Sequence, residues 1–271
     1  MKISIGWFYP DLMSTYGDRG NVMCLSSRCT WRGIDVEIEE ITLETRAKVV
    51  SQCDLLFVGG AQDRQQKIVE KDLREGKGAA IKETVERGIP GLYICAAYQL
   101  FGHSYQPAEG ETLEGLHIFD VESKHPGKGK ERCIGNIVAT LPNEFFNSAS
   151  SVQRLASREE KMTKDKKEPL TIVGFENHGG RTYLGDGVQA LAKVIKGFGN
   201  NGEDGTDGFR YKNAIGNYFH GPFLPKNPHV ADWLIQTALE VKYNTDVQLA
   251  PLDDELEWKA HTAILRKLRI A

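Results

Sequence analysis

The sequence lacks the features that mark several large classes of protein. No apolar run approaches the roughly 20 residues that a membrane-spanning helix needs. The five cysteines, at positions 24, 29, 53, 95 and 133, are odd in number and form no C-x-x-C pair, which argues against a disulfide framework and a zinc knuckle. The chain also lacks a strong charge of either sign. With 34 basic and 37 acidic residues, the formal net charge is −3, which argues against a main task of binding nucleic acid or anionic membranes.

The composition is that of an ordinary folded protein, with 40% hydrophobic and 26% charged residues in a chain of 271. This length allows one domain or two. Because no linker rich in proline or serine interrupts the chain, we expect a single domain over residues 1–271. The segment Met1–Ile5 is typical of a strand and not of a signal peptide, so we expect a cytoplasmic protein.

The first hundred residues alternate between expected strands and helices. The predicted strands are Ile3–Phe8, Ile34–Ile38, Asp54–Val58 and Gly91–Ile94, and helical spacing runs over Asn21–Arg32 and about residues 64–87. Two of these strands are continuous apolar runs, which is typical of parallel strands buried on both faces. The pattern predicts an α/β fold with a doubly wound sheet, whose sites form at the carboxyl ends of the strands.

The second half has more strand character and ends in two helices. Further strands are expected at Ile118–Glu122, Cys133–Leu141, Leu170–Glu176, Arg181–Leu184 and Ala214–Phe219. The charged stretch Ser157–Glu168 is interpreted as a solvated loop, and Lys196–Gly208 as a mobile loop, with a calcium loop as the weaker alternative. The closing helices, Val230–Lys242 and Asp253–Leu268, could pack on this domain or on a partner.

Cys95 is the first candidate for chemistry. It ends a buried strand, and the small residues Ala96 and Ala97 follow, as a nucleophile at a sharp strand-to-helix turn requires. The following helix would present its N-terminus to the sulfur and favour the thiolate. The alternative is a buried cysteine that acts as a small apolar side chain.

His220 is the natural partner for Cys95, because it too follows a core strand at the same edge of the sheet. A cysteine–histidine pair is the minimal arrangement for acyl transfer. Gly59-Gly60, after another buried strand, could bring backbone N–H groups close to a ligand. Together with the N–H of Ala96 they would form an oxyanion hole, although a simple turn is also possible.

The segments Gly91–Gln99, Gly59-Gly60 and Tyr218–Pro222 together resemble the class I glutamine amidotransferases of the cobyric acid synthase type. Longer stretches narrow the resemblance to the GatD family, the glutaminase subunits of lipid II isoglutaminyl synthases. These stretches are Tyr16–Asn21, Gly59–Gln65, Gly174–Thr182 and His220–Asn227. The resemblance implies a flavodoxin-like, mostly parallel sheet flanked by helices.

The resemblance also implies roles for residues of this chain. Cys95 would be the nucleophile and His220 its base. Arg132 would bind the α-carboxylate of glutamine, with a solvated surface arginine as the alternative. Gly60 and Ala96 would line the substrate site, and Gln99 would line the pocket or brace the nucleophile turn. The implied partner is a MurT-like ATP-dependent Mur ligase subunit in a heterodimer, which would handle lipid II. No cofactor or metal is expected in this chain, because it has no G-x-x-x-x-G-K-[ST] motif, and ATP and Mg²⁺ would bind to the partner.

Three departures from the wider class leave alternatives open. Tyr93 and Ala97 stand where glycine is common on either side of the nucleophile, and Pro222 stands where an acid is common two residues after the histidine. Either another group orients His220 or a cysteine–histidine dyad suffices, and Glu176 and His178 are better suited to shaping the pocket. The competing hypotheses are an amidotransferase for a cobyrinate-like acid, a noncatalytic scaffold subunit and a free-standing cysteine hydrolase.

Overall fold

A computed structural model describes residues 1–127, 129–146 and 170–270. Its main feature is a ten-stranded sheet with the order β14-β9-β8-β11-β12-β13-β4-β3-β1-β2. A smaller sheet has the order β10-β7-β5-β6. The α/β sheet flanked by helices agrees with the sequence prediction. The predicted loop Ser157–Glu168 lies outside the described residues.

The N-terminal part of the large sheet is parallel, with β1 paired to β2 and β3, and β4 paired to β3 and β13. These strands are Lys2–Phe8 (β1), Asp35–Ile41 (β2), Leu55–Val58 (β3), Gly91–Ile94 (β4) and Ala214–Asn217 (β13). Every residue of β3 and β4 is buried, which explains why their sequences are apolar without alternation.

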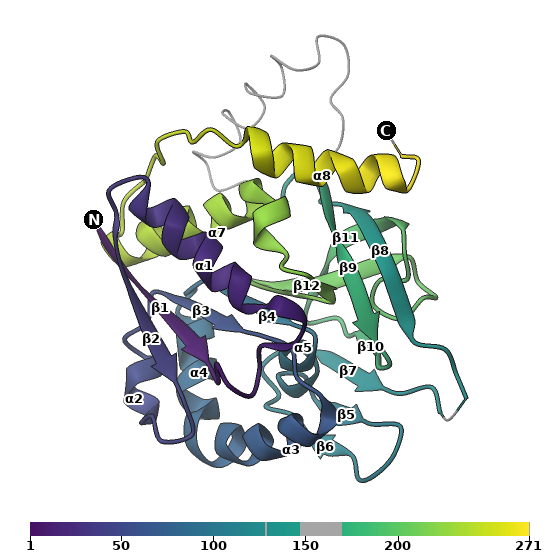
Figure 1. Ribbon diagram of the computed structural model, residues 1–271. Helices are drawn as coiled ribbons and strands as arrows, with labels where there is room; N and C mark the ends of the chain where they lie inside the picture. The colour runs from purple at the N-terminus through teal and green to yellow at the C-terminus, as the bar shows by residue number, and fades with distance from the viewer. Residues whose placement is uncertain (128, 147–169, 271) are drawn as a thin grey trace.

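Helices cover both faces of this parallel part. Figure 1 shows α1 and α7 on one side and α3 and α4 on the other. The helices are Arg19–Thr30 (α1), Ala47–Val50 (α2), Asp63–Asp72 (α3), Gly78–Glu86 (α4), Ala96–Leu100 (α5), Pro228–Tyr243 (α7) and Glu255–Lys267 (α8). A π-helical turn at Leu73–Lys77 joins α3 to α4, and 3₁₀ turns lie at Thr15–Gly17 and Leu224–Lys226.

The other half of the large sheet is antiparallel and extends beyond what the sequence predicted. It contains Cys133–Thr140 (β8), Thr171–His178 (β9), Gln189–Lys196 (β11), Thr206–Tyr211 (β12) and Phe219–His220 (β14). The small sheet contains Ser104–Gln106 (β5), Leu113–Glu114 (β6), Val121–Lys124 (β7) and Arg181–Leu184 (β10). The predicted strand Ile118–Glu122 is therefore displaced toward the C-terminus.

The prediction of a mobile loop over Lys196–Gly208 is wrong at both ends, where β11 ends and β12 begins. The turn between these strands is fixed by its own side chains. Asn200 is fully buried, its Oδ1 accepts from the N–H of Gly208 at 2.8 Å, and its Nδ2 donates to the Gly208 carbonyl at 3.2 Å. A buried amide with partners on both ends holds a turn that its glycine-rich sequence alone would leave free.

The antiparallel half curls back on itself. β13 and β14 are separated only by Tyr218, yet they stand at opposite ends of the six-strand run from β14 to β13. A flat sheet cannot connect its two ends through one residue, so the strands must roll until β14 approaches the carboxyl end of β13. This roll carries His220 toward the end of β4.

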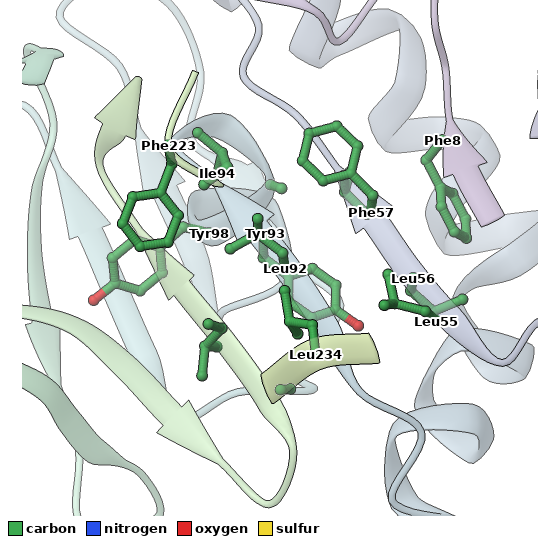
Figure 2. Packing of buried hydrophobic residues seen from close by; sticks show 14 of the residues in the cluster. Phe8, Leu55, Leu56, Phe57, Leu92, Tyr93, Ile94, Tyr98, Phe223 and Leu234 are labelled. Atoms are coloured by element: carbon green, nitrogen blue, oxygen red, sulfur yellow. The ribbon is translucent and has the colours of Figure 1, made fainter. Parts of the chain in front are cut away.

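Nearly all of the buried hydrophobic residues that the structure describes form one continuous cluster. Figure 2 shows Leu55, Leu56 and Phe57 of β3 and Leu92, Tyr93 and Ile94 of β4 within it. Fully burying an aliphatic or aromatic side chain of this size contributes about 1.5–3 kcal/mol. The core therefore gives the ends of β3 and β4 a rigid base.

A buried ion-pair network fixes the C-terminal part of the chain to α1. Arg28 is 1% exposed, and its guanidinium donates to both carboxylate oxygens of Asp232 on α7 and of Asp254 before α8. Arg32 adds a contact to Asp232 at 2.7 Å. Helix α8 also packs against β8 and β9, so both C-terminal helices lie on the core of this chain.

Candidate active site

Cys95 stands at a strained turn between β4 and α5. Its φ of 52° and ψ of −100° lie outside the regions that non-glycine residues favour, a conformation that costs about 1–3 kcal/mol. Its N–H donates to the carbonyl of Asn217 at 2.9 Å, at the end of β13. Ala97 lies within α5 and has no positive φ, so the missing glycine at that position creates no strain.

His220 is fully buried, and its Nδ1 lies 3.0 Å from Oδ1 of Asp18. A carboxylate can only accept, so Nδ1 carries the hydrogen of this bond. The other ring nitrogen, Nε2, has no hydrogen-bond partner among the described residues. The pair with Asp18 therefore fixes the ring and leaves Nε2 free for a reacting group.

Gly60 shows how close these groups lie to one another. A Cβ atom built on Gly60 would lie 2.8 Å from Cε1 of His220, 3.1 Å from Oδ2 of Asp18 and 3.4 Å from Cβ of Cys95. Cys95, His220 and Asp18 thus surround one glycine, although they come from segments far apart in the sequence. The predicted convergence of Cys95 and His220 is present in the structure.

The charge around His220 favours its protonated form. Burial by itself lowers the pKa of His220, but the charge and hydrogen bond of Asp18 and the Cys95 thiol outweigh this and raise it to about 10. Nε2 makes no complete hydrogen bond to the sulfur.

Asp18 is the residue that sequence reasoning missed. It lies between the Thr15–Gly17 turn and α1, is fully buried, and also accepts from the N–H of Gly60 at 2.7 Å. The prediction that the Gly60 N–H points at an oxyanion is not met in this structure, because that N–H is bonded to Asp18. The missed signal was an acid in the polar segment after the first buried strand, at the same sheet edge as Cys95.

Pro222 occupies the position where the wider class often has an acid, and it packs instead on Gly20. A Cβ atom on Gly20 would lie 2.5 Å from Cγ of Pro222. Next to this contact, Asn21 accepts from the N–H of Leu224 at 2.8 Å. These contacts hold the segment after His220 against the start of α1, beside Asp18.

The side chains of Glu176 and His178 form no hydrogen bond or ion pair with His220. Both oxygens of Glu176 accept backbone N–H groups, from Phe198 at 2.8 Å and Gly199 at 3.0 Å. The His178 ring stacks on Tyr218 with centroids 3.7 Å apart, and burial lowers the pKa of His178. These two side chains shape the loops around the site, as the sequence suggested.

Gln99 is buried beneath the nucleophile turn. Its Nε2 donates to the hydroxyl of Tyr218 at 3.1 Å, and its Oε1 accepts from Nε2 of Gln66 at 3.2 Å. The Tyr218 hydroxyl also contacts Oγ1 of Thr182. With both ends of its amide engaged by protein groups, Gln99 braces α5 against α3 and the strand region of Tyr218.

Arg132 lies at the exposed rim, where Asn177 orients it. Its Nε donates to Oδ1 of Asn177 and its Nη2 to the Asn177 carbonyl, both at 3.0 Å. Its Nη1 lies 3.2 Å from where a Cβ of Gly179 would be. The absence of a side chain at Gly179 thus lets the guanidinium approach the backbone closely, next to the His125 ring, which lies nearer still.

The described residues contain no group of three or more His, Cys, Asp or Glu side chains arranged to hold a metal ion. Nor do they include a helix with the length and apolar character needed to cross a bilayer. In space, the site brings together a thiol, an imidazole and a carboxylate, with the imidazole bonded to the carboxylate and close to the cysteine, on an α/β fold. This combination defines a cysteine-dependent acyl-transfer site.

Comparison with known proteins gives the family. Residues 4–228 match the model of the CobB/CobQ-like glutamine amidotransferase domain, and the chain belongs to this family. Within it, the chain is 37% identical over 266 residues to the GatD subunit of lipid II isoglutaminyl synthase (glutamine-hydrolyzing) from Staphylococcus aureus strain N315, covering 97% of this chain and 95% of the relative.

A second relative agrees with this assignment, and a solved structure agrees with the fold. The GatD subunit from Streptococcus pneumoniae strain ATCC BAA-255 / R6 is 34% identical over 255 residues, covering 94% of this chain and 87% of the relative. The glutaminase domain of Trypanosoma brucei CTPS matches with a TM-score of 0.54 at 14% identity, covering 92% of this chain and 96% of that one. The similarity to this solved structure supports the fold alone.

Proposed function

We propose that this chain is the glutaminase subunit of a lipid II isoglutaminyl synthase. Two GatD subunits are similar to it over nearly its whole length. The observation that carries the proposal is the Asp18–His220 pair held beside Cys95. A scaffold that had lost its activity would have no need to keep a buried carboxylate on the far side of the imidazole.

In the first step, the Cys95 thiolate attacks the side-chain carboxamide carbon of L-glutamine. Because His220 has its pKa raised to about 10, it holds a proton at neutral pH. As the tetrahedral intermediate collapses, the C–N bond breaks and Nε2 of His220 gives its proton to the leaving nitrogen, which departs as ammonia. A γ-glutamyl thioester remains on Cys95.

In the second step, water hydrolyses the thioester. His220, now neutral, takes a proton from the attacking water while Asp18 keeps Nδ1 protonated. Glutamate leaves and the thiolate–imidazolium pair is restored. The N–H of Ala96, in the first turn of α5, is the expected oxyanion donor, because the first N–H groups of a helix have no intrahelical partner.

Ammonia made here would be used by another subunit. The sequence carries no phosphate-binding P-loop motif, so we propose a MurT-like ligase that uses ATP and Mg²⁺. This ligase would amidate the α-carboxyl of D-glutamate in the lipid II stem peptide. The heterodimer would act in the cytoplasm and meet the membrane only through its lipid-linked substrate.

The test is glutamine-dependent amidation by the chain co-purified with its ligase. Wild type should release ammonia from L-glutamine and transfer it to a D-glutamate-containing acceptor, whereas Cys95→Ser should release none and keep its fold. Unchanged ammonia release by Cys95→Ser would reject the nucleophile. Amidation of a cobyrinate-like acid instead would keep the chemistry and change the acceptor.

A further inference from the structure

His220 is closed off from solvent, although the proposed reaction requires small molecules to reach it. The ring is fully buried, and its Nε2 has no hydrogen-bond partner among the described residues. Both steps of the proposed reaction bring a small molecule to Nε2, because the leaving nitrogen takes a proton there and the attacking water gives one up. A group beside the ring must therefore move during turnover.

Tyr16 is a neighbour of His220 that can move outward. Its ring lies against the imidazole in an edge-to-face arrangement, with centroids 4.9 Å apart and an interplanar angle of 68°. Tyr16 is 44% exposed, whereas Asp18 is fully buried and Cys95 is 8% exposed. Of these three side chains beside the imidazole, Tyr16 is therefore the one that can swing into solvent without disturbing the core.

The backbone of Tyr16 has an unusual conformation, which the surrounding contacts maintain. Its φ of 59° and ψ of 25° are left-handed, a region that non-glycine residues seldom occupy. The N–H of Thr15 donates to the carbonyl of Gly60 at 3.1 Å, and Asp18 accepts from the N–H of Gly60 at 2.7 Å, so the turn is fixed on both sides of Tyr16. Strain of this kind is common at functional sites. The turn that positions the carboxylate of Asp18 thus also positions the aromatic ring.

The molecule that accepts the γ-glutamyl group must come close to Nε2 of His220, because this nitrogen takes its proton. We propose that the Tyr16 ring selects this acceptor, moving far enough to admit water and release ammonia while it excludes larger amines. This inference rests on the proposed glutaminase function and deepens it. Without the ring, an amine nitrogen would attack the thioester carbon, the C–S bond would break to restore the Cys95 thiolate, and neutral His220 would take the proton that the nitrogen loses. The product would be a γ-glutamyl amide instead of glutamate.

The experiment gives the chain co-purified with its ligase L-glutamine and one of two competing amines, hydroxylamine or O-benzylhydroxylamine. These reagents share the same nucleophilic –NH₂ group and differ in bulk. The ratio of the benzyl product to the hydroxamate, measured by mass spectrometry, should rise by about 10-fold in Tyr16→Ala, as expected if a barrier of about 1.4 kcal/mol to the larger amine is lost. Tyr16→Phe retains the ring and should keep the wild-type ratio, and Tyr16→Leu should lie between the two.

Trp31→Ala is the matched control, because Trp31 is an exposed aromatic residue at the C-terminal end of α1 and should leave the ratio unchanged. The ratio reports only molecules that have formed the thioester, so a slow or partly unfolded variant still gives a valid value, and Tyr16→Leu replaces Tyr16→Ala if the latter does not fold. An unchanged ratio in the variant without the ring, or an equal rise in Tyr16→Phe, would overturn the inference and leave the proposed function standing. If the wild-type complex releases no ammonia, the proposed function and the inference both fail.

Discussion

Asp18 and His220 lie 202 positions apart in the sequence, yet their side chains meet at 3.0 Å and are both fully buried. The carboxylate binds Nδ1 of the imidazole through one oxygen and the N–H of Gly60 through the other. One side chain thus orients the base and holds the loop after β3. Any change at Asp18 must act on both.

Asp18→Asn should therefore lower kcat for ammonia release by about 100- to 10,000-fold, with a smaller effect on KM. The amide can present its N–H to Nδ1, which favours the tautomer with the hydrogen on Nε2 and stops His220 from acting as a base. Steady-state kinetics with L-glutamine measure this. Asp11→Asn, at an exposed acid in the same loop, is the control. Full activity of Asp18→Asn would show that a dyad suffices.

The Gly60→Ala substitution tests the close approach of the three groups. The new methyl group would lie 2.8 Å from Cε1 of His220, too close for an ordinary contact, so the ring must move. We expect kcat to fall by about 100-fold, the effect of a small misplacement of a catalytic group. Gly135→Ala, which adds a methyl group with nothing within 4 Å, should be nearly neutral. Equal activity of the two variants would contradict the geometry.

Cys95→Gly should be more stable than Cys95→Ala by about 1 kcal/mol. Both variants lose the thiol, but only glycine relieves the backbone strain at a φ of 52°. At most positions the order is the opposite, and a protein with glycine is less stable than the same protein with alanine. Urea unfolding midpoints of the two variants measure the difference. A more stable alanine variant would mean that Cys95 is not strained.

The pH dependence of stability tests the His220 environment. The folded protein holds a proton on His220 up to a pKa of about 10, whereas an unfolded histidine releases it near 6.5. The free energy of unfolding contributed by this proton is complete below about pH 6.5 and falls as the pH rises toward 10. His220→Gln should lack this decline. Parallel curves for the two proteins would place His220 in a neutral state.

The sequence predicted the parallel half of the sheet and two members of the site for a common reason. Buried parallel strands have continuous apolar runs, and a polar residue directly after such a run stands at the edge where sites form. Cys95 satisfies this rule directly after β4, and His220 lies three residues beyond the end of β13, where the predicted single strand Ala214–Phe219 is in fact divided into β13 and β14. Asp18 does not stand directly after a strand, because the Thr15–Gly17 turn lies between it and β1.

The rest of the fold depends on contacts that local pattern does not contain. β14 has only two residues, and it is a strand because Phe219 and His220 pair with Glu176 and Phe175 of β9. The turn between β11 and β12 was expected to move, but Asn200 and its partners fix it. The N–H of Gly60 was expected to face an oxyanion, but it donates to Asp18 instead. Only folding brings Asp18 close to Gly60.

The order of these groups along the chain has a consequence for the newly made protein. The carboxylate emerges from the ribosome first, the sulfur well after it, and the imidazole only when four-fifths of the chain has been synthesised. An incomplete chain consequently has a thiol without its base. A chain that ends before position 220 therefore lacks the imidazole that the proposed glutamine hydrolysis needs.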